Sequence, residues 1–459
     1  MSSTFQGIET ALRGTLAHQQ AVNTAAHNVA NASTPGYSRQ TPIFTTTAGS
    51  PAASFAGYPT AGPTGTGVSI SQIQRQHDQY LDGRLRDSES TYSFWETQQQ
   101  SMEEIEGVVS QSEGSGLNAL MDDFWNAWQS FSQATPDDAG IRTVALAKGT
   151  SLAVGFNAAA NNLAQVGSDA RATLNDSVKR VNEIAKGLAS VNSQLRAIGG
   201  MGGEPNDLLD QRDALLSELS GLADIDVYEG EYGACNVAVG SRLLVQETKA
   251  ASLSVPLGSP AQVFWEDGQQ ADISEGKIAG LMQVENAIVP AQQAKLTALR
   301  TALVTRVNAL HQTGKDLDGN MGGDFFTVAG DGTVSVAITD PRRLAVSADG
   351  STGNADVALA IAGLRNAAIP EMGNITLRED YSAWVSEVGA QSRELGDMTD
   401  RTGARRDAMQ KDREGVAGVN LDEEAAHLVQ WQRAFTASAK VMTVLDDMLK
   451  TVIEDLGVG

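Results

Sequence analysis

Residues 2–31, at the start of the chain, read SSTFQGIETALRGTLAHQQAVNTAAHNVAN and are strongly periodic. Mostly apolar side chains recur here at alternating spacings of three and four, a heptad pattern that places them on one face of a helix. The stripe consists of Phe5, Ile8, Leu12, Thr15, Gln19, Val22, Ala26 and Val29. Pro35 and Gly36 form a turn pair, so the helix is predicted to end near Asn31.

The other end of the chain carries a matching stripe. Its members are Leu428, Trp431, Phe435, Ser438, Met442, Leu445, Leu449, Val452 and Leu456. Asn420 or Asp422 is expected to cap this helix. Isolated helices with a single apolar stripe are marginal in water. We therefore expect the two terminal helices to bury their stripes against each other and then against neighbouring molecules. The alternative is two unrelated helices of a globular core.

Between the two ends, helical segments from both halves of the chain enclose segments of β character. A loop is predicted for 41–67, and helical patterns cover 73–111, 141–198, 206–222, 278–312 and 375–413. Strand-like alternation appears at 225–228, 236–239 and 334–347. The predicted fold is mainly α with an inserted β domain, and its N- and C-terminal helices form a coiled-coil base. The expected division is 1–40 and 418–459 for the terminal helices; 41–222, 276–314 and 372–417 for a helical rod; and 223–275 and 315–371 for a mostly β outer domain.

Composition limits the classes of function. Hydrophobic residues make up 41% of the 459 residues, which is enough to build several cores. The net charge of −23 disfavours binding to nucleic acid and to anionic membrane surfaces. No apolar run approaches the ~20 residues of a membrane-spanning helix, and the N-terminal segment lacks the pattern of a cleavable secretion signal. The single Cys235 cannot form an intrachain disulfide.

Motifs for catalysis or cofactor binding are missing from the sequence. The five histidines form no HExxH pair, and neither a GxSxG elbow nor a complete phosphate-binding loop occurs. We therefore expect no catalytic residues, cofactor or structural metal. Trp125 and Trp128 lie three residues apart on one predicted helical face and are expected in the core, with carbohydrate stacking as the alternative.

One loop contains several side chains whose oxygen atoms could bind a cation. Asp316, Asp318, Asn320 and Asp324 have spacings that resemble a calcium loop, but the closing Glu is missing. Asp, Asn and Gly are also the usual formers of turns. A turn is the favoured interpretation, and a cation at 316–324 is left open.

Two segments at opposite ends of the chain resemble the paired signatures of bacterial flagellar rod, hook and hook-associated proteins. Residues 26–40 read AHNVANASTPGYSRQ, and residues 419–425 and 432–441 read VNLDEEA and QRAFTASAKV. Trp431 and Phe435 stand where relatives tend to carry Tyr, which keeps an aromatic side chain at each position. The internal stretch 205–213, PNDLLDQRD, is similar to that of the proteins that join the hook to the filament.

The resemblance implies a non-enzymatic structural subunit of the flagellum, outside the cell at the hook–filament junction and required for filament attachment. It implies unfolded export through the flagellar type III channel without a cleaved signal peptide, and self-assembly in a helical layer. The implied partners are the flagellar hook protein, a second junction protein, and an export chaperone that binds the C-terminal helix. Another axial protein, such as a hook or rod protein, is one alternative, and a soluble coiled-coil adaptor is another.

The resemblance and the two stripes together predict an assembly interface on the terminal helices. Asn28 and Asn31 are included for helix termination and lateral packing, which explain them better than a catalytic amide does. The predicted interface consists of Phe5, Ile8, Leu12, Val22, Asn28, Val29, Asn31, Leu428, Trp431, Phe435, Met442, Leu445, Leu449 and Val452.

Overall fold

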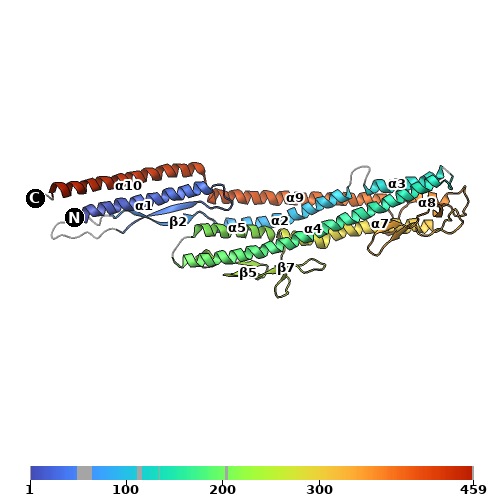
Figure 1. The fold of residues 1–459 in the computed structure, drawn as a ribbon, viewed down its shortest axis with the longest axis horizontal. Helices are drawn as coiled ribbons and strands as arrows, with labels where there is room; N and C mark the ends of the chain where they lie inside the picture. The colour runs from blue at the N-terminus through green and yellow to red at the C-terminus, as the bar shows by residue number, and fades with distance from the viewer. Residues whose placement is uncertain (1, 49–64, 111–115, 134, 202–204, 457–459) are drawn as a thin grey trace. The chain divides into compact units, whose positions relative to one another are not determined.

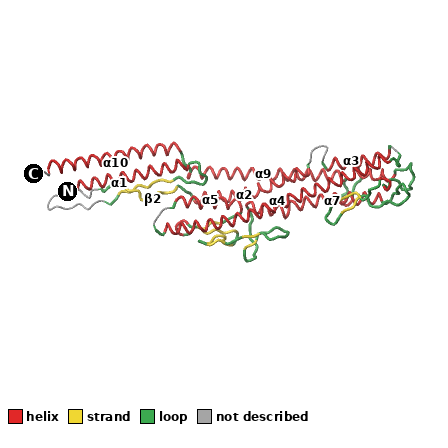
Figure 2. The backbone as a smooth tube through the Cα atoms, in the orientation of Figure 1, coloured by secondary structure: helices red, strands yellow, loops and turns green. Residues whose placement is uncertain are grey.

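The structure, a computed structural model, describes residues 2–48, 65–110, 116–133, 135–201 and 205–456. The chain divides into two compact units. Unit 1 comprises residues 1–90, 181–252 and 404–459, and unit 2 comprises residues 91–180 and 253–403. Figure 2 shows short strands set among long helices, which confirms the predicted class of a mainly α fold with an inserted β region.

The terminal helices belong to unit 1 and lie side by side (Figure 1). They are α1 (Ser2–Asn31) and α10 (Leu421–Leu456), and we call them the terminal pair. Strands β1 (Gln40–Thr46) and β2 (Val68–Arg75) form an antiparallel hairpin that contacts α1. The small core of this region contains Ala21, Ala25 and Trp431, with Val22, Phe44, Ile70 and Leu428 packed against it.

Local chemistry explains where the terminal helices stop and start. Helix α1 ends at Asn31, as predicted, and the following turn has Gly36 at φ +80°, a conformation that glycine adopts without strain. At the start of α10, Asn420 Oδ1 accepts the backbone N–H of Asp422 at 3.0 Å, which confirms Asn420 as the cap.

The rest of unit 1 joins a helix to a small sheet. Helix α5 (Asn206–Leu222) has the predicted bounds, and a meander follows it in the order β3-β4-β5-β6. The strands are β3 (Asp226–Glu229), β4 (Cys235–Val239), β5 (Arg242–Gln246) and β6 (Lys249–Ala250). Asn192, in helix α4 (Ala139–Gly199), donates to the carbonyls of Cys235 and Glu247 at 2.7 Å, so its amide ties the sheet to the helix.

Unit 2 is mostly helical. Its helices include most of α2 (Gln79–Val109), the first part of α4, and most of α9 (Leu377–Ala417), together with α3 (Leu117–Gln129), α6 (Gly276–Gln283), α7 (Val289–His311) and α8 (Asp356–Gly363). A π-helical turn, Val284–Ile288, separates α6 from α7. Pro290 lies at the start of α7, and a proline has no N–H to continue a regular α ladder. Thr376 and Glu379 form a reciprocal capping box at the start of α9.

Two short hairpins complete unit 2. Strands β7 (Leu253–Ser254) and β8 (Phe264–Trp265) form one, and β9 (Phe326–Val328) and β10 (Val334–Val336) form the other. Short 3-10 turns occur at Ser130–Ser132, Glu231–Gly233, Pro341–Arg343, Leu364–Asn366 and Pro370–Met372. Within the described residues, no helix combines the length and hydropathy that a membrane span requires.

An aromatic cluster closes one end of unit 2. It consists of Phe124, Trp128, Phe131, Phe325 and Phe326, all nearly or fully buried. The Trp128 and Phe325 ring centroids lie 5.3 Å apart, and those of Phe325 and Phe326 lie 4.7 Å apart. Trp125 is also buried, which confirms that both tryptophans belong to the core.

Two expectations for the segment after α1 were wrong. Strand β1 (Gln40–Thr46) occupies the start of the loop expected over 41–67, whose residues 49–64 lie outside the described part of the chain, and strand β2 (Val68–Arg75) occupies the start of the helix expected from 73. Helix α2 begins only at Gln79, where Asp78 Oδ1 accepts the N–H groups of Tyr80 and Leu81. The two strands are far apart in sequence and pair with each other, a contact that local patterns do not report.

Candidate assembly interface

The terminal pair packs through small residues on α1. Gly7, Ala11, Gly14, Ala21 and Ala25 are on the face of this helix that carries its buried positions. A Cβ atom on Gly7 would lie 3.1 Å from Leu445 Cδ1, and one on Gly14 would lie 3.1 Å from Ser438 Oγ. The two helices therefore approach each other too closely for larger side chains on α1.

Helix α10 faces α1 with its predicted stripe. Trp431 is 9% exposed, and the other stripe members that face inward are half-buried: Leu428, Phe435, Met442, Leu445 and Leu449. Val452 differs from them, because it is 51% exposed, and the side chain of Leu456 lies outside the described part of the stripe. The inward face of α10 therefore supplies the larger side chains of this contact.

Only part of the stripe predicted for α1 is buried in the single chain. Ile8 and Val22 are half-buried, whereas Phe5, Leu12 and Val29 are 62%, 42% and 39% exposed. The expectation that the two stripes bury each other within one chain was therefore wrong for these three residues, and their burial against neighbouring molecules stays a prediction. The physical reason is that the glycine and alanine face of α1 allows the closer approach, so the larger side chains turn outward.

The outward faces of the terminal pair carry a set of large apolar side chains. On α1 they are Phe5, Leu12, Leu16 and Val29, and on α10 they are Leu421, Val429, Val441, Val444, Met448, Val452 and Ile453. We call this set the outward apolar face. Large apolar surfaces exposed on one element are typical of interaction sites. Leu16 and the α10 residues apart from Val452 were missed, because they do not belong to the stripes.

A groove runs along the contact between α1 and α10. It has a volume of about 630 Å³ and extends to Gly65, Gly67 and Val68 at the start of β2. On the helices its lining includes Gly7, Ala11, Gly14, Val441 and Leu445.

Asn28 has an internal role in unit 1. Its Nδ2 donates to Gln40 O at 2.8 Å and to Glu424 Oε2 at 3.1 Å, and its Oδ1 accepts the N–H of Gln40 and the hydroxyl of Tyr37. One amide therefore joins the end of α1, the following turn and the start of α10. Asn31 Nδ2 donates to His27 O at 3.1 Å, which fits helix termination.

Unit 1 also contains a group of charged residues that we call the ionic cluster. It consists of Arg75, His77, Asp82, Asp210, Arg212, Asp213 and Arg413. The stretch PNDLLDQRD supplies Asp210, Arg212 and Asp213 from α5. Burial alone would raise the pKa of Asp82, but its hydrogen bond with His77 and the charge of Arg413 outweigh burial and lower that pKa.

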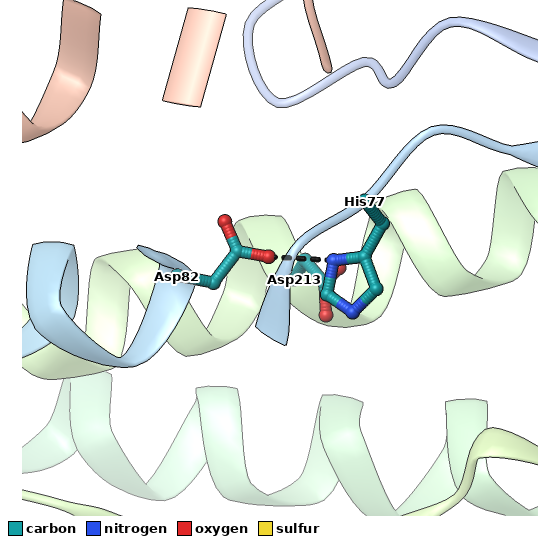
Figure 3. Close-up of side chains that lie close together, drawn as sticks. All are labelled: His77, Asp82 and Asp213. Atoms are coloured by element: carbon teal, nitrogen blue, oxygen red, sulfur yellow. Dashed lines mark ion pairs between the residues drawn. The ribbon is translucent and has the colours of Figure 1, made fainter. Parts of the chain in front are cut away.

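Part of the ionic cluster has the composition of a metal site. His77, Asp82 and Asp213 place one ligand atom each within 4.8 Å of one another, and Figure 3 shows the contact between His77 and Asp82. The carboxylates are already engaged, however, because Asp82 accepts Arg413 Nε at 2.8 Å and Asp213 accepts Arg212 and Arg75. A cation would have to approach positive guanidinium groups, so the residues present favour ion pairing over metal binding.

The loop that resembles a calcium site is organised by its own backbone. Asp316 Oδ1 accepts the N–H groups of Asp318 and Asn320 at 2.9 and 2.8 Å, and Asp318 Oδ1 pairs with Arg342 at 2.6 Å. This is the geometry of an Asx turn, so the structure supports the favoured interpretation of the loop.

Comparison with protein families matches three segments of the chain. Residues 102–326 match the flagellar hook-associated protein FlgK helical domain. Residues 8–37 match the flagella basal body rod protein family, and residues 416–455 match the C-terminal family of the flagellar basal body rod FlgEFG proteins. The terminal matches cover most of the terminal pair, and the first match covers all of α3 through α7.

Relatives that align over nearly the full length of the chain share the same protein name. The chain is 30% identical to the flagellar hook-associated protein 1 of Bacillus subtilis strain 168, with all of both chains covered. It is 24% identical to the protein of the same name from Escherichia coli K12, covering 97% of this chain and 99% of the relative. Its fold is similar to that of the flagellar hook junction protein FlgK from Burkholderia pseudomallei, with a TM-score of 0.65 and 16% identity, covering 73% of this chain and all of that one.

Proposed function

The chain belongs to the family of flagellar hook-associated protein 1, and we propose that it forms the layer that joins the hook to the filament. It is a structural, hook-associated component of the bacterial flagellum. The observation that carries the proposal is the terminal pair, whose outward apolar face stays exposed in a single chain. Exposed apolar surface of this kind is typical of sites that other subunits cover.

The proposed mechanism is mechanical and involves no catalysis. Copies of the terminal pair pack side by side through the outward apolar face and form a helical layer. This assembly uses the predicted residues Phe5, Leu12, Val29 and Val452, together with Leu16 and the other exposed members of the face. The inward residues of α10, such as Trp431 and Leu445, act earlier, because they hold the pair together within each subunit.

The proposed partners follow from the position of the junction. The flagellar hook protein lies below this layer, and a second junction protein lies above it. Before export, a chaperone covers α10, whose exposed apolar residues would otherwise associate with other chains. The protein then leaves the cell unfolded, through the flagellar export channel and without a cleaved signal peptide.

We also propose a functional division of the chain. Residues 1–40 and 418–459 form the assembly base, and residues 41–222, 276–314 and 372–417 form a helical rod that makes lateral contacts. Residues 223–275 and 315–371 form the outer part. A hook or rod protein is the nearest alternative, but the match to a hook-associated helical domain at 102–326 favours the junction protein.

The proposal is tested in a motile strain that lacks the gene for this protein. The strain is expected to make hooks without filaments, and the full chain should restore filaments. A chain truncated after Val419 lacks α10 and should fail to restore them, although it is produced. Filaments of normal number in the truncated strain would contradict the proposed role of the terminal pair.

A single substitution gives a sharper version of this test. Leu445→Asp places a charge where the side chain meets Gly7, so the pair should open and assembly should fail while unit 2 stays folded. Gln432→Asp adds the same charge at an exposed position of α10 and serves as the control. Electron microscopy of flagella measures assembly, and near-UV circular dichroism of the purified chains measures folding. A soluble adaptor would instead keep its terminal helices protected from protease in the monomer.

A further inference from the structure

The ionic cluster joins three parts of unit 1 that are distant in sequence. Arg75 is the last residue of strand β2, and His77 follows shortly after it. Asp82 lies in the first turn of α2, and Arg413 lies near the end of α9. Helix α5 supplies Asp210, Arg212 and Asp213. The side chains of Arg75, Arg212 and Asp213 are only 6%, 6% and 8% exposed. Charged groups at this level of burial require partners.

Each charge in the cluster has such a partner. Arg75 Nε donates to Asp210 Oδ1 at 2.7 Å, and its terminal nitrogen donates to Asp213. Arg212 donates to Asp213 at 2.7 Å and to the carbonyl of Gly233 at 2.5 Å. Three guanidinium groups thus face three carboxylates, with His77 beside Asp82 at 2.7 Å. Removing one member of a buried pair leaves an uncompensated charge and is strongly destabilising.

The segment after α1 is hydrogen-bonded to α5, the helix that supplies three members of this cluster. The backbone N–H of Ser38 donates to Asp210 at 3.4 Å, and Gln40 Nε2 donates to Asp207 at 3.1 Å. In the opposite direction, Asn206 Nδ2 donates to the carbonyl of Ile73 at 2.7 Å. The segments on both sides of the hairpin are therefore tied to α5.

The apolar core of the terminal pair does not extend to α5, although the turn after α1 touches it where a Cβ on Gly36 would lie 3.5 Å from Ala214 Cβ. The core of the terminal pair is built from α1, α10, β1 and β2, and it contains no residue of α5. Hydrogen bonds and ion pairs have strict geometry, whereas apolar contacts tolerate sliding. The polar contacts between α5 and the hairpin are therefore the ones whose geometry can fix a direction.

We propose that the ionic cluster is a latch that fixes the direction of the terminal helices relative to α5, and that assembly requires this fixed direction. The stretch PNDLLDQRD is then the part of the chain that sets the angle at which each subunit presents its terminal pair. The second half of this proposal rests on the proposed function, and the first half does not.

The latch is tested first in the isolated, full-length protein. Exposed Ser217 on α5 and exposed Ala437 on α10 are replaced by cysteine and spin-labelled. The native Cys235 is 1% exposed, so the labels attach to the introduced positions. Pulsed electron paramagnetic resonance then gives the distribution of distances between the two labels. A narrow distribution is expected in the parent chain.

The decisive variant is Asp213→Asn, which keeps the shape of the side chain and removes its charge. The latch predicts a distance distribution at least twofold broader, with unchanged circular dichroism of the helices. Glu247→Gln breaks the exposed pair with Arg196, whose side chains are 39% and 65% exposed, and it should leave the distribution narrow. A narrow distribution in Asp213→Asn, even with a lowered unfolding midpoint, would overturn the latch.

A second pair shows whether the effect depends on pairing. Asp82→Asn and Arg413→Gln should each broaden the distribution, and the double variant should be no broader than the worse single variant, because both remove the same contact. Additive broadening would mean that the two residues act separately and would count against a latch.

The assembly half is tested in the strain that lacks the gene. The wild-type chain should restore filaments, and Asp213→Asn should restore less than one tenth as many while being exported normally. If the wild-type chain restores none, the proposed function fails. If Asp213→Asn restores filaments as well as the wild type does, only the role of the latch in assembly fails.

Discussion

The terminal pair and the aromatic cluster bury their apolar side chains in opposite ways. In the aromatic cluster, Phe124, Trp128 and Phe325 are 0% exposed, so this part of the chain closes its own core. In the terminal pair, several of the larger side chains of α1 are exposed, among them Phe5 at 62% and Leu16 at 56%. The aromatic cluster is therefore fully packed within a single chain, whereas the terminal pair has an exposed surface suited to contact with further copies.

The largest effect of a substitution on stability is expected in the aromatic cluster. Phe325→Ala removes a ring that packs on Trp128, Phe124 and Phe326, and it should lower the free energy of unfolding by about 3–5 kcal/mol. Chemical denaturation followed by near-UV circular dichroism measures the change. A loss below about 1 kcal/mol would show that this core is not closed.

A second prediction concerns the buried His311 beside this cluster. Burial lowers its pKa from the ordinary 6.5, and the neutral ring accepts the N–H of Ala345 at 2.9 Å and contacts Gly323 O at 2.6 Å. Because the folded pKa is depressed, this contribution to stability is complete above about pH 6.5 and is lost as the pH falls below it. Unfolding midpoints of unit 2 between pH 7.5 and 5 measure the loss.

The His311→Asn variant is the control for this pH dependence. It should be less stable than the parent at pH 7.5, because the ring no longer satisfies the buried N–H of Ala345. Its stability should also fall less on acidification, because one titrating group is gone. An equal slope in both chains would exclude His311 as the cause.

A smaller effect on stability is expected at the close contact of the terminal pair. Gly14→Leu places a large side chain where a Cβ would already lie 3.1 Å from Ser438 Oγ. Overpacking of this kind costs about 1–3 kcal/mol, and here the cost should be confined to α1 and α10. Hydrogen exchange of the two helices should rise while exchange in unit 2 is unchanged. Faster exchange in both units would contradict the local effect.

The smallest effect on the stability of the single chain is expected on the outward apolar face. Leu16→Gln changes a side chain that is 56% exposed, so the free energy of unfolding should stay within about 0.5 kcal/mol. Filament restoration in cells should nevertheless fall, because the proposed contact between copies is lost. Ala437→Gln, also at an exposed position, serves as the control on α10. Normal filaments in Leu16→Gln would remove this residue from the interface.

Local patterns predicted the helices well and the hairpin poorly. Helix α5 has the predicted bounds, α1 ends at Asn31 as expected, and α4 differs from its prediction by two residues at one end and one at the other. These features depend on caps, turn residues and apolar periodicity, which act over a few positions. Strands β1 and β2 depend on pairing across more than twenty residues, so the segment 41–67 was read as a loop.

The candidate site was predicted in part for the same reason. The inward residues of α10, from Leu428 to Leu449, lie on the face that the spacing indicated. Leu16 and the glycine face of α1 were missed, although Gly7, Ala11, Gly14, His18, Ala21, Ala25 and Asn28 repeat at alternating spacings of four and three. That second stripe was the available signal.

The sequence alone determined which residues of each terminal helix share a face, because the rise and turn of an α-helix are fixed by its backbone. It did not determine which face of α1 meets α10, because two heptad stripes on α1 compete for that contact. The tertiary structure selected the stripe of small residues, since only glycine and alanine let the two backbones come close. The ionic cluster was likewise a tertiary outcome, because its charges come from β2, α2, α5 and α9 and become partners only when these segments meet.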